Sequence, residues 1–438
     1  MIWHIIARIG PKDAFAPILT PADPRIEVAI DQPGNNNQVV HHLLEDLYKC
    51  GLTPSTEALD LLNLAVAAYT ADLRVPRTFS DDRWRREFCV YLPVRSPDKW
   101  NALKAQVSSL LSFLTGDVWG LEFRSLGEQP TPAPGIPLVA PPSLVCLFSG
   151  GLDSFAGALD ILSQTSDHVA LVGHYGSGST HGEQKRVYQP INAAYPNRTT
   201  PLWFFVEPKK LDKHQAEDTM RSRSIIFLAL GTAVASSLNG EQVTLSVPEN
   251  GLISLNVPLT DARAGSLSTR TTHPHVVGLF QGILGALSLS VRIETPFKFS
   301  TKGEILVNST DQETLRASAR TTMSCSRPSA GRYQHRSPGK HCGYCLPCII
   351  RRAAMKVAEL DDAADYSFDL LKDKSKASEP RGRDRRALEM AIERLQDMSD
   401  LEVAAEVAGT GPVPPADLPS LVQVYKRGLA EVAAFLPG

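Results

Sequence analysis

The sequence lacks a hydrophobic run long enough to cross a lipid bilayer. Its longest apolar segment, Gly278–Val291, contains Gln281 and is shorter than the roughly 20 residues that a transmembrane helix needs. The first residues also lack the basic-then-apolar order of a secretory signal peptide. We therefore expect a cytoplasmic protein that does not partner with a membrane.

An excess of charge of either sign is also missing. The chain has 45 Lys and Arg against 47 Asp and Glu, which gives a net charge of −2. Broad electrostatic binding to nucleic acid needs a basic surplus, so nucleic acid is not an expected partner. Apolar residues make up 43% and charged residues 21%, as in globular proteins. A chain of 438 residues exceeds one ordinary core, so we expect two or three domains.

Proline is concentrated in one stretch, residues 127–143 (GEQPTPAPGIPLVAPPS), which predicts a semi-rigid linker between domains. Residues 1–126 before it predict a small α/β domain, with a role in presenting a partner or substrate. Its expected strands are Met1–Gly10, Arg86–Val94 and Val118–Leu126, and its expected helices are Asn35–Gly51, Thr53–Leu73 and Pro97–Leu114.

Apolar strands alternate with helical patterns between residues 144 and about 310. This alternation predicts a parallel sheet with helices on both faces, in a domain that we place at 144–368. Ligands of such sheets bind at the carboxyl ends of the strands. Residues 369–438 predict a helical C-terminal extension, with helices over Ala387–Met398, Leu401–Ala408 and Leu418–Phe435.

A pair of glycines separates the first of these strands from a helix. The apolar run Leu144–Phe148 leads into residues 149–154 (SGGLDS), hereafter the elbow, and then into a helical pattern. Glycine allows a sharp turn, and the first turn of a helix offers unpaired N–H groups and the positive end of its dipole. The stretch therefore predicts an anion site, in which Asp153 holds Mg²⁺ or caps the helix. A plain strand-to-helix turn is the alternative.

The elbow resembles the PP-loop of ATP pyrophosphatases, which holds the pyrophosphate of ATP while AMP is transferred. It differs from a Walker A loop, because it lacks the lysine of that motif. Three later stretches narrow the resemblance: Arg223–Leu228 (RSIIFL), Pro296–Ile305 (PFKFSTKGEI) and a four-cysteine cluster. In this order they are similar to QueC, the ATP-dependent synthase of 7-cyano-7-deazaguanine, over residues 144–360.

The resemblance implies roles for individual residues. Asp153, Arg223 and Lys302 are the expected catalytic residues, the two cations contacting phosphate or the activated substrate. Ser224 stands where that family usually has Asn. The expected ATP-binding residues are Ser149, Gly150, Gly151, Leu152, Asp153, Ser154 and His174; the last lies in a glycine-rich stretch that a plain loop explains equally well.

The polar stretch Pro248–His275 follows a predicted strand of the sheet, where a substrate should lie. Arginine suits a carboxylate because it donates a planar pair of hydrogen bonds. A solvated loop is the alternative. The residues expected to bind a deazaguanine are Glu249, Asn250, Arg270, Thr272 and His273.

Four of the seven cysteines are clustered, whereas Cys50, Cys89 and Cys146 are scattered among apolar residues. Thiolates in C-x2-C-x2-C spacing suit tetrahedral Zn²⁺, and four protein ligands make such a site structural. An iron–sulfur cluster is the alternative, and His341 could replace one ligand. The expected ligands are Cys325, Cys342, Cys345 and Cys348.

The hypothesis that follows is an ATP-dependent carbon–nitrogen ligase that adenylates the carboxylate of 7-carboxy-7-deazaguanine and then forms an amide. Residues 1–126 and 369–438 lengthen the chain beyond short QueC proteins, as in the QueC-like ligases of the Qat and type IV CBASS anti-phage systems. That resemblance implies a partner protein from the same defence operon. A housekeeping synthase that uses ammonia and a non-catalytic nucleotide-binding scaffold are the alternatives. A tRNA-sulfurating enzyme is disfavoured by the balanced charge.

Overall fold

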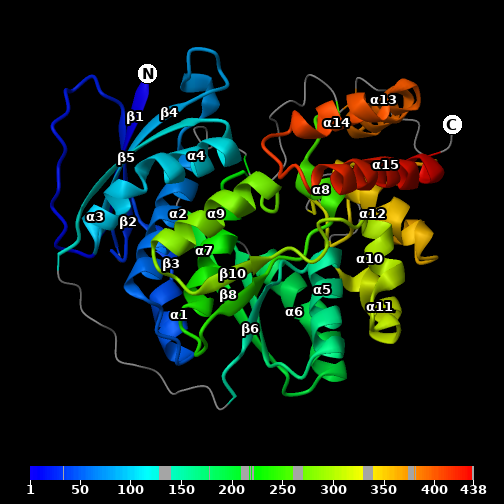
Figure 1. The fold of residues 1–438 in the computed structure, drawn as a ribbon. Coiled ribbons are helices and arrows are strands. Elements are labelled where there is room, and N and C mark those ends of the chain that lie inside the picture. The colour runs from blue at the N-terminus through cyan, green and yellow to red at the C-terminus, as the bar shows by residue number, and fades with distance from the viewer. Residues whose placement is uncertain are drawn as a thin grey trace.

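The computed structural model contains two β-sheets with helices around them (Figure 1). It describes the whole chain except residues 33, 128–139, 177, 209–216, 218, 220, 260–269, 329–338, 373–378, 380 and 437–438. Most of the predicted linker and part of the polar stretch 248–275 therefore lie outside the described residues. In the part of the chain that is described, no helix is both long and apolar enough to cross a membrane.

The first sheet has the strand order β2-β1-β4-β5 with neighbouring strands parallel, from β1 (Ile2–Ile9), β2 (Arg25–Ile30), β4 (Glu87–Val94) and β5 (Val118–Ser125). The predicted strands at 1–10, 86–94 and 118–126 are confirmed, and β2 was not predicted. Helices α2 (Thr56–Arg74), α3 (Pro97–Ala102) and α4 (Lys104–Thr115) confirm the helical patterns at 53–73 and 97–114.

The predicted helix Asn35–Gly51 is wrong in its first half. That part of the chain forms β3 (Val39–His41), and only α1 (Leu43–Lys49) is helical. Two successive valines favour a strand, because branching at Cβ restricts their side chains in a helix. The apolar spacing that suggested one long helix therefore joins a strand and a helix that are separate elements.

The second sheet has the order β10-β9-β6-β7-β8-β3. Strand β3 runs antiparallel to β8, and the other neighbouring pairs of described strands are parallel. The predicted parallel α/β sheet is thereby confirmed. Its strands from residues 144 onward are β6 (Leu144–Leu147), β7 (Val169–Tyr175), β8 (Thr199–Pro208), β9 (Val243–Ser246) and β10 (Val291–Glu294).

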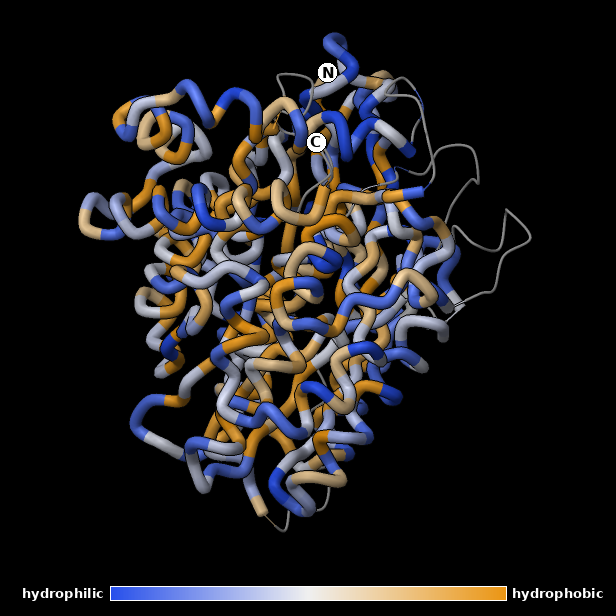
Figure 2. Tube along the Cα trace, turned by 90° about the vertical axis from the view of Figure 1, so that its right-hand side faces the viewer, coloured by the Kyte–Doolittle hydropathy of each residue, from blue (hydrophilic) through white to orange (hydrophobic). Residues whose placement is uncertain are grey.

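Helices cover both faces of this sheet, as the burial of alternate strand residues shows. Val145 and Leu147 of β6 join the core cluster that contains α7 (Arg223–Ala235) and α9 (Pro274–Ala286). Their neighbour Cys146 joins the cluster beneath α5 (Leu152–Gln164) and α6 (Gly178–Ala194). Because successive residues of a strand point to opposite faces, the two clusters lie on opposite sides of the sheet. Figure 2 shows hydrophobic segments (orange) mainly toward the middle of the molecule and hydrophilic segments (blue) mainly at its periphery.

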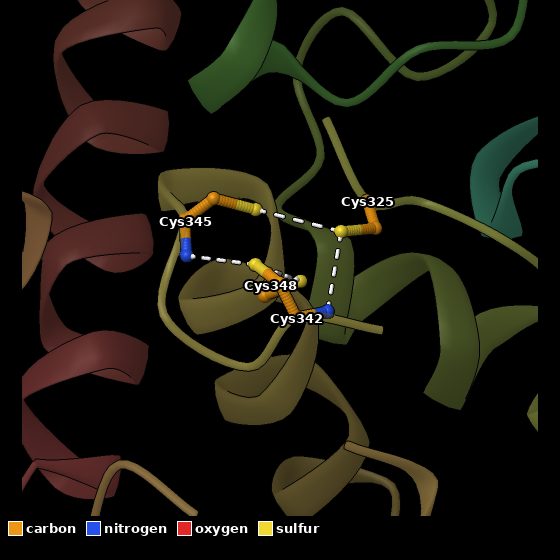
Figure 3. Close-up of side chains that lie close together, drawn as sticks. All are labelled: Cys325, Cys342, Cys345 and Cys348. Carbon is orange, nitrogen blue, oxygen red and sulfur yellow. Dashed lines mark hydrogen bonds between the residues drawn. The ribbon is translucent and has the colours of Figure 1, made fainter. Parts of the chain in front are cut away.

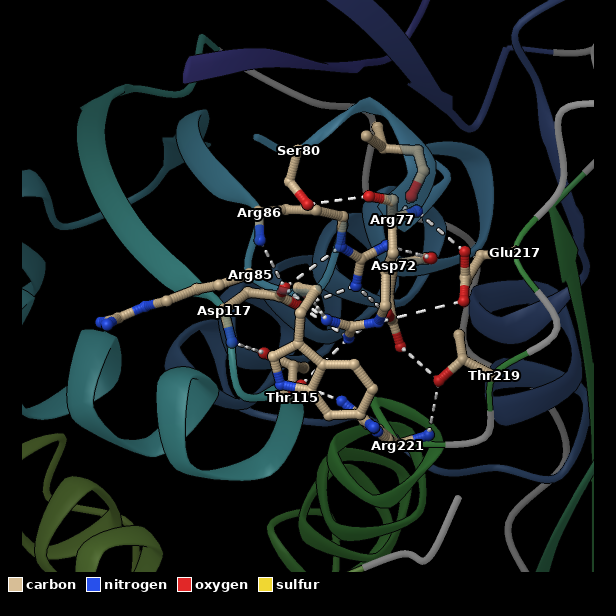
Figure 4. A network of polar contacts seen from close by, with 12 residues as sticks. Asp72, Arg77, Ser80, Arg85, Arg86, Thr115, Asp117, Glu217, Thr219 and Arg221 are labelled. Carbon is tan, nitrogen blue, oxygen red and sulfur yellow. Dashed lines mark hydrogen bonds and ion pairs between the residues drawn. The ribbon is translucent and has the colours of Figure 1, made fainter. Parts of the chain in front are cut away.

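The N-terminal residues are joined to the second sheet by more than the linker. Strand β3 extends its edge, and α2 packs against α7. A buried group of charges lies near the contact of α2 with α7 (Figure 4). In it, Arg86 pairs with both Asp72 and Asp117, and Arg77 pairs with Asp117 at 2.8 Å. The carboxylate of Asp72 also accepts hydrogen bonds from the backbone and hydroxyl of Ser222, at the start of α7. The domain boundary at 127–143 remains a prediction.

The C-terminal residues contain the three predicted helices, as α13 (Arg383–Asp397), α14 (Asp400–Ala408) and α15 (Leu418–Phe435). Helix α15 packs against α8 (Gly251–Leu255) and α12 (Leu346–Val357), within a core cluster that includes Cys342, Cys345 and Cys348. Two short helices, α10 (Lys302–Asn308) and α11 (Gln312–Ser318), precede the four cysteines in the chain.

Candidate functional site

The elbow has the strand–turn–helix form expected from its sequence. Strand β6 ends at Leu147 and α5 begins at Leu152. Gly150 has φ +82°, in the left-handed region that favours glycine, and a Cβ there would lie 3.3 Å from the side chain of Gln184. The hydroxyl oxygens of Ser149 and Ser154 are 3.3 Å apart. Two hydroxyls and the helix N-terminus therefore meet at one turn, as an anion site requires.

A segment from much later in the chain lies against the elbow. The backbone N–H of Met323 donates to the carbonyl oxygen of Gly150 at 2.8 Å. The N–H of Leu152, at the first position of α5, donates to the hydroxyl oxygen of Ser324 at 3.1 Å. An anion on this helix terminus would therefore share or replace the hydroxyl of Ser324.

Asp153, on the first turn of α5, is the centre of a buried polar cluster. Lys302 Nζ donates to its Oδ1, and Asn250 donates to its Oδ2 from Nδ2 at 2.7 Å and from the backbone at 3.2 Å. Lys302 is the first residue of α10, where Thr301 and Glu304 cap the helix reciprocally. Asn250 caps α8 through Oδ1. Three residues separated widely in the sequence are thus held by three helix N-termini.

Glu249 belongs to the same cluster. Its Oε2 accepts a hydrogen bond from Thr272 Oγ1, which also contacts the hydroxyl of Ser254. Burial raises the pKa of Glu249 to about 7; the hydrogen bond from Thr272 opposes this shift, and the charge of Asp153 adds to it. Glu249 therefore changes its protonation near neutral pH, unlike an ordinary surface carboxylate.

Arg223 and His174 form a second group. Arg223 Nε donates to His174 Nδ1 at 3.2 Å, and its Nη2 donates to the carbonyl oxygen of His174 at 3.2 Å. His174 Nε2 donates to the carbonyl oxygen of Val206 at 3.1 Å. Burial, followed by the charge of Arg223, lowers the pKa of His174 to about 3, so the ring is neutral. The imidazole holds the guanidinium in place, and the predicted contact of His174 with adenine or ribose remains a prediction.

Arg270 and His273 point toward α4 and the C-terminal residues. Arg270 donates to the carbonyl oxygen of Phe113 at 3.2 Å, with its guanidinium over the phenyl ring. His273 Nδ1 accepts from the backbone N–H of His275, and its Nε2 lies 2.9 Å from Thr410 Oγ1. The structure thus groups Glu249, Asn250 and Thr272 with Asp153, whereas these two residues contact other elements. Their role in substrate binding remains a prediction.

Two residues near the elbow were not identified from the sequence. Gln184 on α6 is fully buried; its Nε2 donates to the carbonyl oxygen of His174 at 3.1 Å, and its Oε1 has no hydrogen-bond partner among the described residues. Ser324 supplies the hydroxyl that faces Leu152. Neither residue belongs to a motif, because a single Gln on a helix or Ser in a loop has no characteristic spacing. The only feature of the sequence that could have drawn attention to Ser324 is its position next to Cys325.

The four predicted cysteine ligands come together (Figure 3). Their sulfur atoms all lie within 4.8 Å of one another, with Cys325 Sγ 3.9 Å from Cys345 Sγ and Cys342 Sγ 3.8 Å from Cys348 Sγ. Tetrahedral Zn²⁺ with Zn–S bonds of about 2.3 Å places its sulfur atoms about 3.8 Å apart. The group could therefore hold one tetrahedral ion such as Zn²⁺. In an iron–sulfur cluster the four thiolates are divided among two or four irons, so thiolates on different irons lie farther apart.

The backbone around the sulfurs suits thiolates. The N–H groups of Arg327 and Cys342 donate to Cys325 Sγ at 3.2 and 3.3 Å, and the N–H of Cys345 donates to Cys342 Sγ at 3.3 Å. Gly343 has φ +88°, and a Cβ there would lie 2.1 Å from the carbonyl oxygen of Phe368. The alternative ligand His341 lies outside the group of four, since its Nε2 accepts from the backbone of Ser324 at 3.3 Å.

Comparison with known proteins adds a family likeness over part of the chain. Residues 205–359 match the family model described as queuosine biosynthesis protein QueC. The chain is also similar to the 7-cyano-7-deazaguanine synthases of Brucella ovis, Brucella suis and Brucella melitensis, each 27% identical over 161 residues. These matches cover 35% of this chain and 59% of the length of the curated relatives. Over the segment that supplies Arg223, Glu249, Lys302 and the four cysteines, the chain is QueC-like.

Proposed function

We propose that the protein is an ATP-dependent carbon–nitrogen ligase that activates the carboxylate of a 7-deazaguanine, 7-carboxy-7-deazaguanine, as its adenylate. The carboxylate attacks the α-phosphate of ATP, pyrophosphate leaves, and an amine then displaces AMP to give an amide. The observation that carries the proposal is the polar cluster of Asp153, Lys302, Asn250 and Glu249 beside the elbow. The similarity to 7-cyano-7-deazaguanine synthases supports the substrate class.

The arrangement of charge suits phosphoryl chemistry. The elbow offers backbone N–H groups and two serine hydroxyls for the pyrophosphate. Lys302 is a buried cation whose position Asp153 fixes, so it can stabilise negative charge on the α-phosphate without reorganising. Arg223 is the second fixed cation. Asp153 is a carboxylate of the kind that binds the Mg²⁺ expected to accompany ATP.

The acceptor amine distinguishes two versions of the proposal. Residues 1–126 and 369–438 pack on the QueC-like segment, through α2 on α7 and α15 on α12. They offer surface for a second protein, as the resemblance to QatC of the Qat anti-phage system suggests. We therefore propose a partner protein from the same defence operon as the source of the amine, in the cytoplasm where ATP is available. The alternative is ammonia, as in a housekeeping synthase.

The decisive experiment incubates the purified protein with ATP, Mg²⁺ and 7-carboxy-7-deazaguanine. Formation of AMP and pyrophosphate that depends on the deazaguanine is the expected result, and release of ADP and phosphate would contradict it. Intact-mass analysis of a co-expressed partner then detects a conjugate, whereas a nitrile formed from ammonia without any partner would favour the housekeeping synthase. ATP binding without turnover, and biological activity that persists in Asp153→Ala, would identify a non-catalytic scaffold.

A further inference from the structure

The position of Glu249 follows from the order of the strands. Strand β6 leads into the elbow, and its parallel neighbour β9 leads into Glu249, so both lie at the carboxyl end of the sheet. Thr272 holds one carboxylate oxygen of Glu249, and Ser254 holds Thr272 in turn. The side chain is thus oriented by a chain of hydroxyls beside the Asp153–Lys302 pair.

A neutral amine that attacks an adenylate must lose one proton to give the amide, because its nitrogen becomes positively charged when its electron pair forms the new bond. A group that accepts this proton needs an available acceptor atom close to the elbow. Building on the function proposed above, we propose that Glu249 is the proton acceptor for the attacking amine. The inference rests on its placement beside the elbow and on its hydroxyl-fixed orientation.

The other titratable groups of the site are already committed to hydrogen bonds. Both carboxylate oxygens of Asp153 accept from Lys302 and Asn250. Both ring nitrogens of His174 are occupied, by Arg223 and by the carbonyl of Val206. Those of His273 are occupied by His275 and Thr410. Among the titratable side chains of the site that the structure describes, Glu249 is the one whose carboxylate accepts from a single residue, through the hydroxyl and backbone of Thr272, so that lone pairs remain available.

The surroundings of Glu249 also tune it for this role. Burial and the neighbouring Asp153 raise its pKa, while the hydrogen bond from Thr272 and the charge of Lys302 act in the opposite direction. The resulting pKa of about 7 is close to neutral pH, where a general base is both largely ionised and able to hold a proton.

In the proposed step the amine nitrogen forms a bond to the acyl carbon of the adenylate. The bond between that carbon and the phosphate oxygen breaks, and AMP leaves with the electron pair. The proton of the amine passes to the carboxylate of Glu249, which returns it to solvent. Neither an oxidant nor a second nucleotide is needed for this amide-forming step.

The test separates the two half-reactions in Glu249→Gln, using 7-carboxy-7-deazaguanine and a peptide or ammonia as the amine. Exchange of labelled pyrophosphate into ATP reports adenylation, and amide formation reports the amine step. We expect exchange within threefold of the unsubstituted protein and amide formation reduced by 10²–10⁴-fold. Glu241→Gln, the same change at an exposed residue just before the opposite end of β9, should alter neither rate.

Outcomes that overturn the inference differ from those that overturn the proposed function. Equal loss of exchange and amide formation in Glu249→Gln would make Glu249 a ligand of ATP or Mg²⁺. Unchanged amide formation would exclude a proton-accepting role. With rates expressed per unprotonated amine, the amide rate of the unsubstituted protein should rise with pH through about 7 and then level, and this rise should disappear in Glu249→Gln. Absence of any deazaguanine-dependent exchange in the unsubstituted protein would reject the proposed function itself.

Discussion

The hydroxyl oxygen of Ser324 lies 3.1 Å from the backbone nitrogen of Leu152 and accepts its hydrogen bond. Ser324 immediately precedes Cys325, one of the four clustered cysteines, and its own N–H donates to His341, which precedes Cys342. Ser324, which contacts the elbow, is therefore held on both sides by the four-cysteine group: by its bond to Cys325 in the chain and by its hydrogen bond to the residue before Cys342. Loss of structure around the cysteines should therefore also disturb the elbow.

Metal removal is the first prediction. A tight chelator that extracts the ion should lower the thermal midpoint and weaken ATP binding together, because the segment 323–325 loses its anchor. Elemental analysis should find one zinc per chain before treatment. Cys342→Ser should reproduce the loss, and Cys50→Ser, a half-buried cysteine outside the group, should retain the metal. Retention of ATP affinity in metal-free protein would show that the two sites are independent.

Lys302→Met should strongly reduce adenylation. The change removes a fixed cation and leaves Asp153 as a buried carboxylate without its charge partner. We expect pyrophosphate exchange to fall by about 10²-fold or more. Lys298→Met, which removes a partly exposed lysine paired with Asp417, is the matched control and should retain exchange. A Lys302→Met protein that is folded by circular dichroism and fully active would exclude this role.

Gly150→Ala should damage nucleotide binding more than folding. Alanine at φ +82° is strained by about 1–2 kcal/mol, and its Cβ would press on Gln184. The turn that presents the elbow would therefore shift. Gly285→Ala on α9 offers a control, because a Cβ there meets nothing within 4 Å and alanine favours the helix. Calorimetric titration with a non-hydrolysable ATP analogue compares the two variants, and equal affinities would count against the elbow as the ATP site.

Mild acid should destabilise the protein. Burial lowers the pKa of His174, His273 and His341 to about 3, whereas an unfolded histidine titrates near 6.5. Between these values the unfolded state binds more protons, so stability falls as the pH falls below about 6.5. Each histidine should contribute a loss on the order of 2 kcal/mol by pH 5. Urea unfolding of His174→Gln should show a smaller pH dependence than that of the exposed control His42→Gln; equal dependence would refute the assignment.

The buried charges of Figure 4 should contribute to the free energy of unfolding. Asp117→Asn removes the carboxylate that pairs with Arg77 and Arg86, which leaves two buried guanidinium groups with less compensation. Breaking a buried pair in this way costs about 3–5 kcal/mol. Glu393→Gln, which breaks an exposed pair with Arg386, should cost about 0–1 kcal/mol. Denaturant titration measures both, and equal small effects would mean that the buried group is not a stabilising unit.

Local sequence patterns were enough to predict much of the fold. The period of the apolar residues predicted α2, α15, the strands β1, β4 and β5 and the alternation of strands and helices from residue 144, since each of these segments buries one face or both. The pattern failed at β3, whose three residues are too few for a period and whose partner β8 lies far away in the sequence. Strand β2 was missed for a related reason, because it begins in a polar, proline-containing stretch.

Residues of the site could be predicted where they belong to a motif with fixed sequence spacing. The cysteines and the elbow have fixed intervals, so their residues could be named in advance. Contacts between distant segments could not be read in this way. The bonds of Asp153 with Asn250 and Lys302, and that of His174 with Arg223, depend on which loops the sheet brings together. Gln184 and Ser324 could be found only from the three-dimensional arrangement.

The pairing of β3 with β8 also bears on how the chain is made. The two paired segments are Val39–His41 and Val206–Pro208, so the ribosome must add well over a hundred residues between them. At roughly 5–20 residues per second, β3 waits on the order of ten seconds or longer for its partner. During that interval its backbone is open to chaperones and to neighbouring nascent chains. Slowed translation between these segments should therefore favour aggregation over assembly.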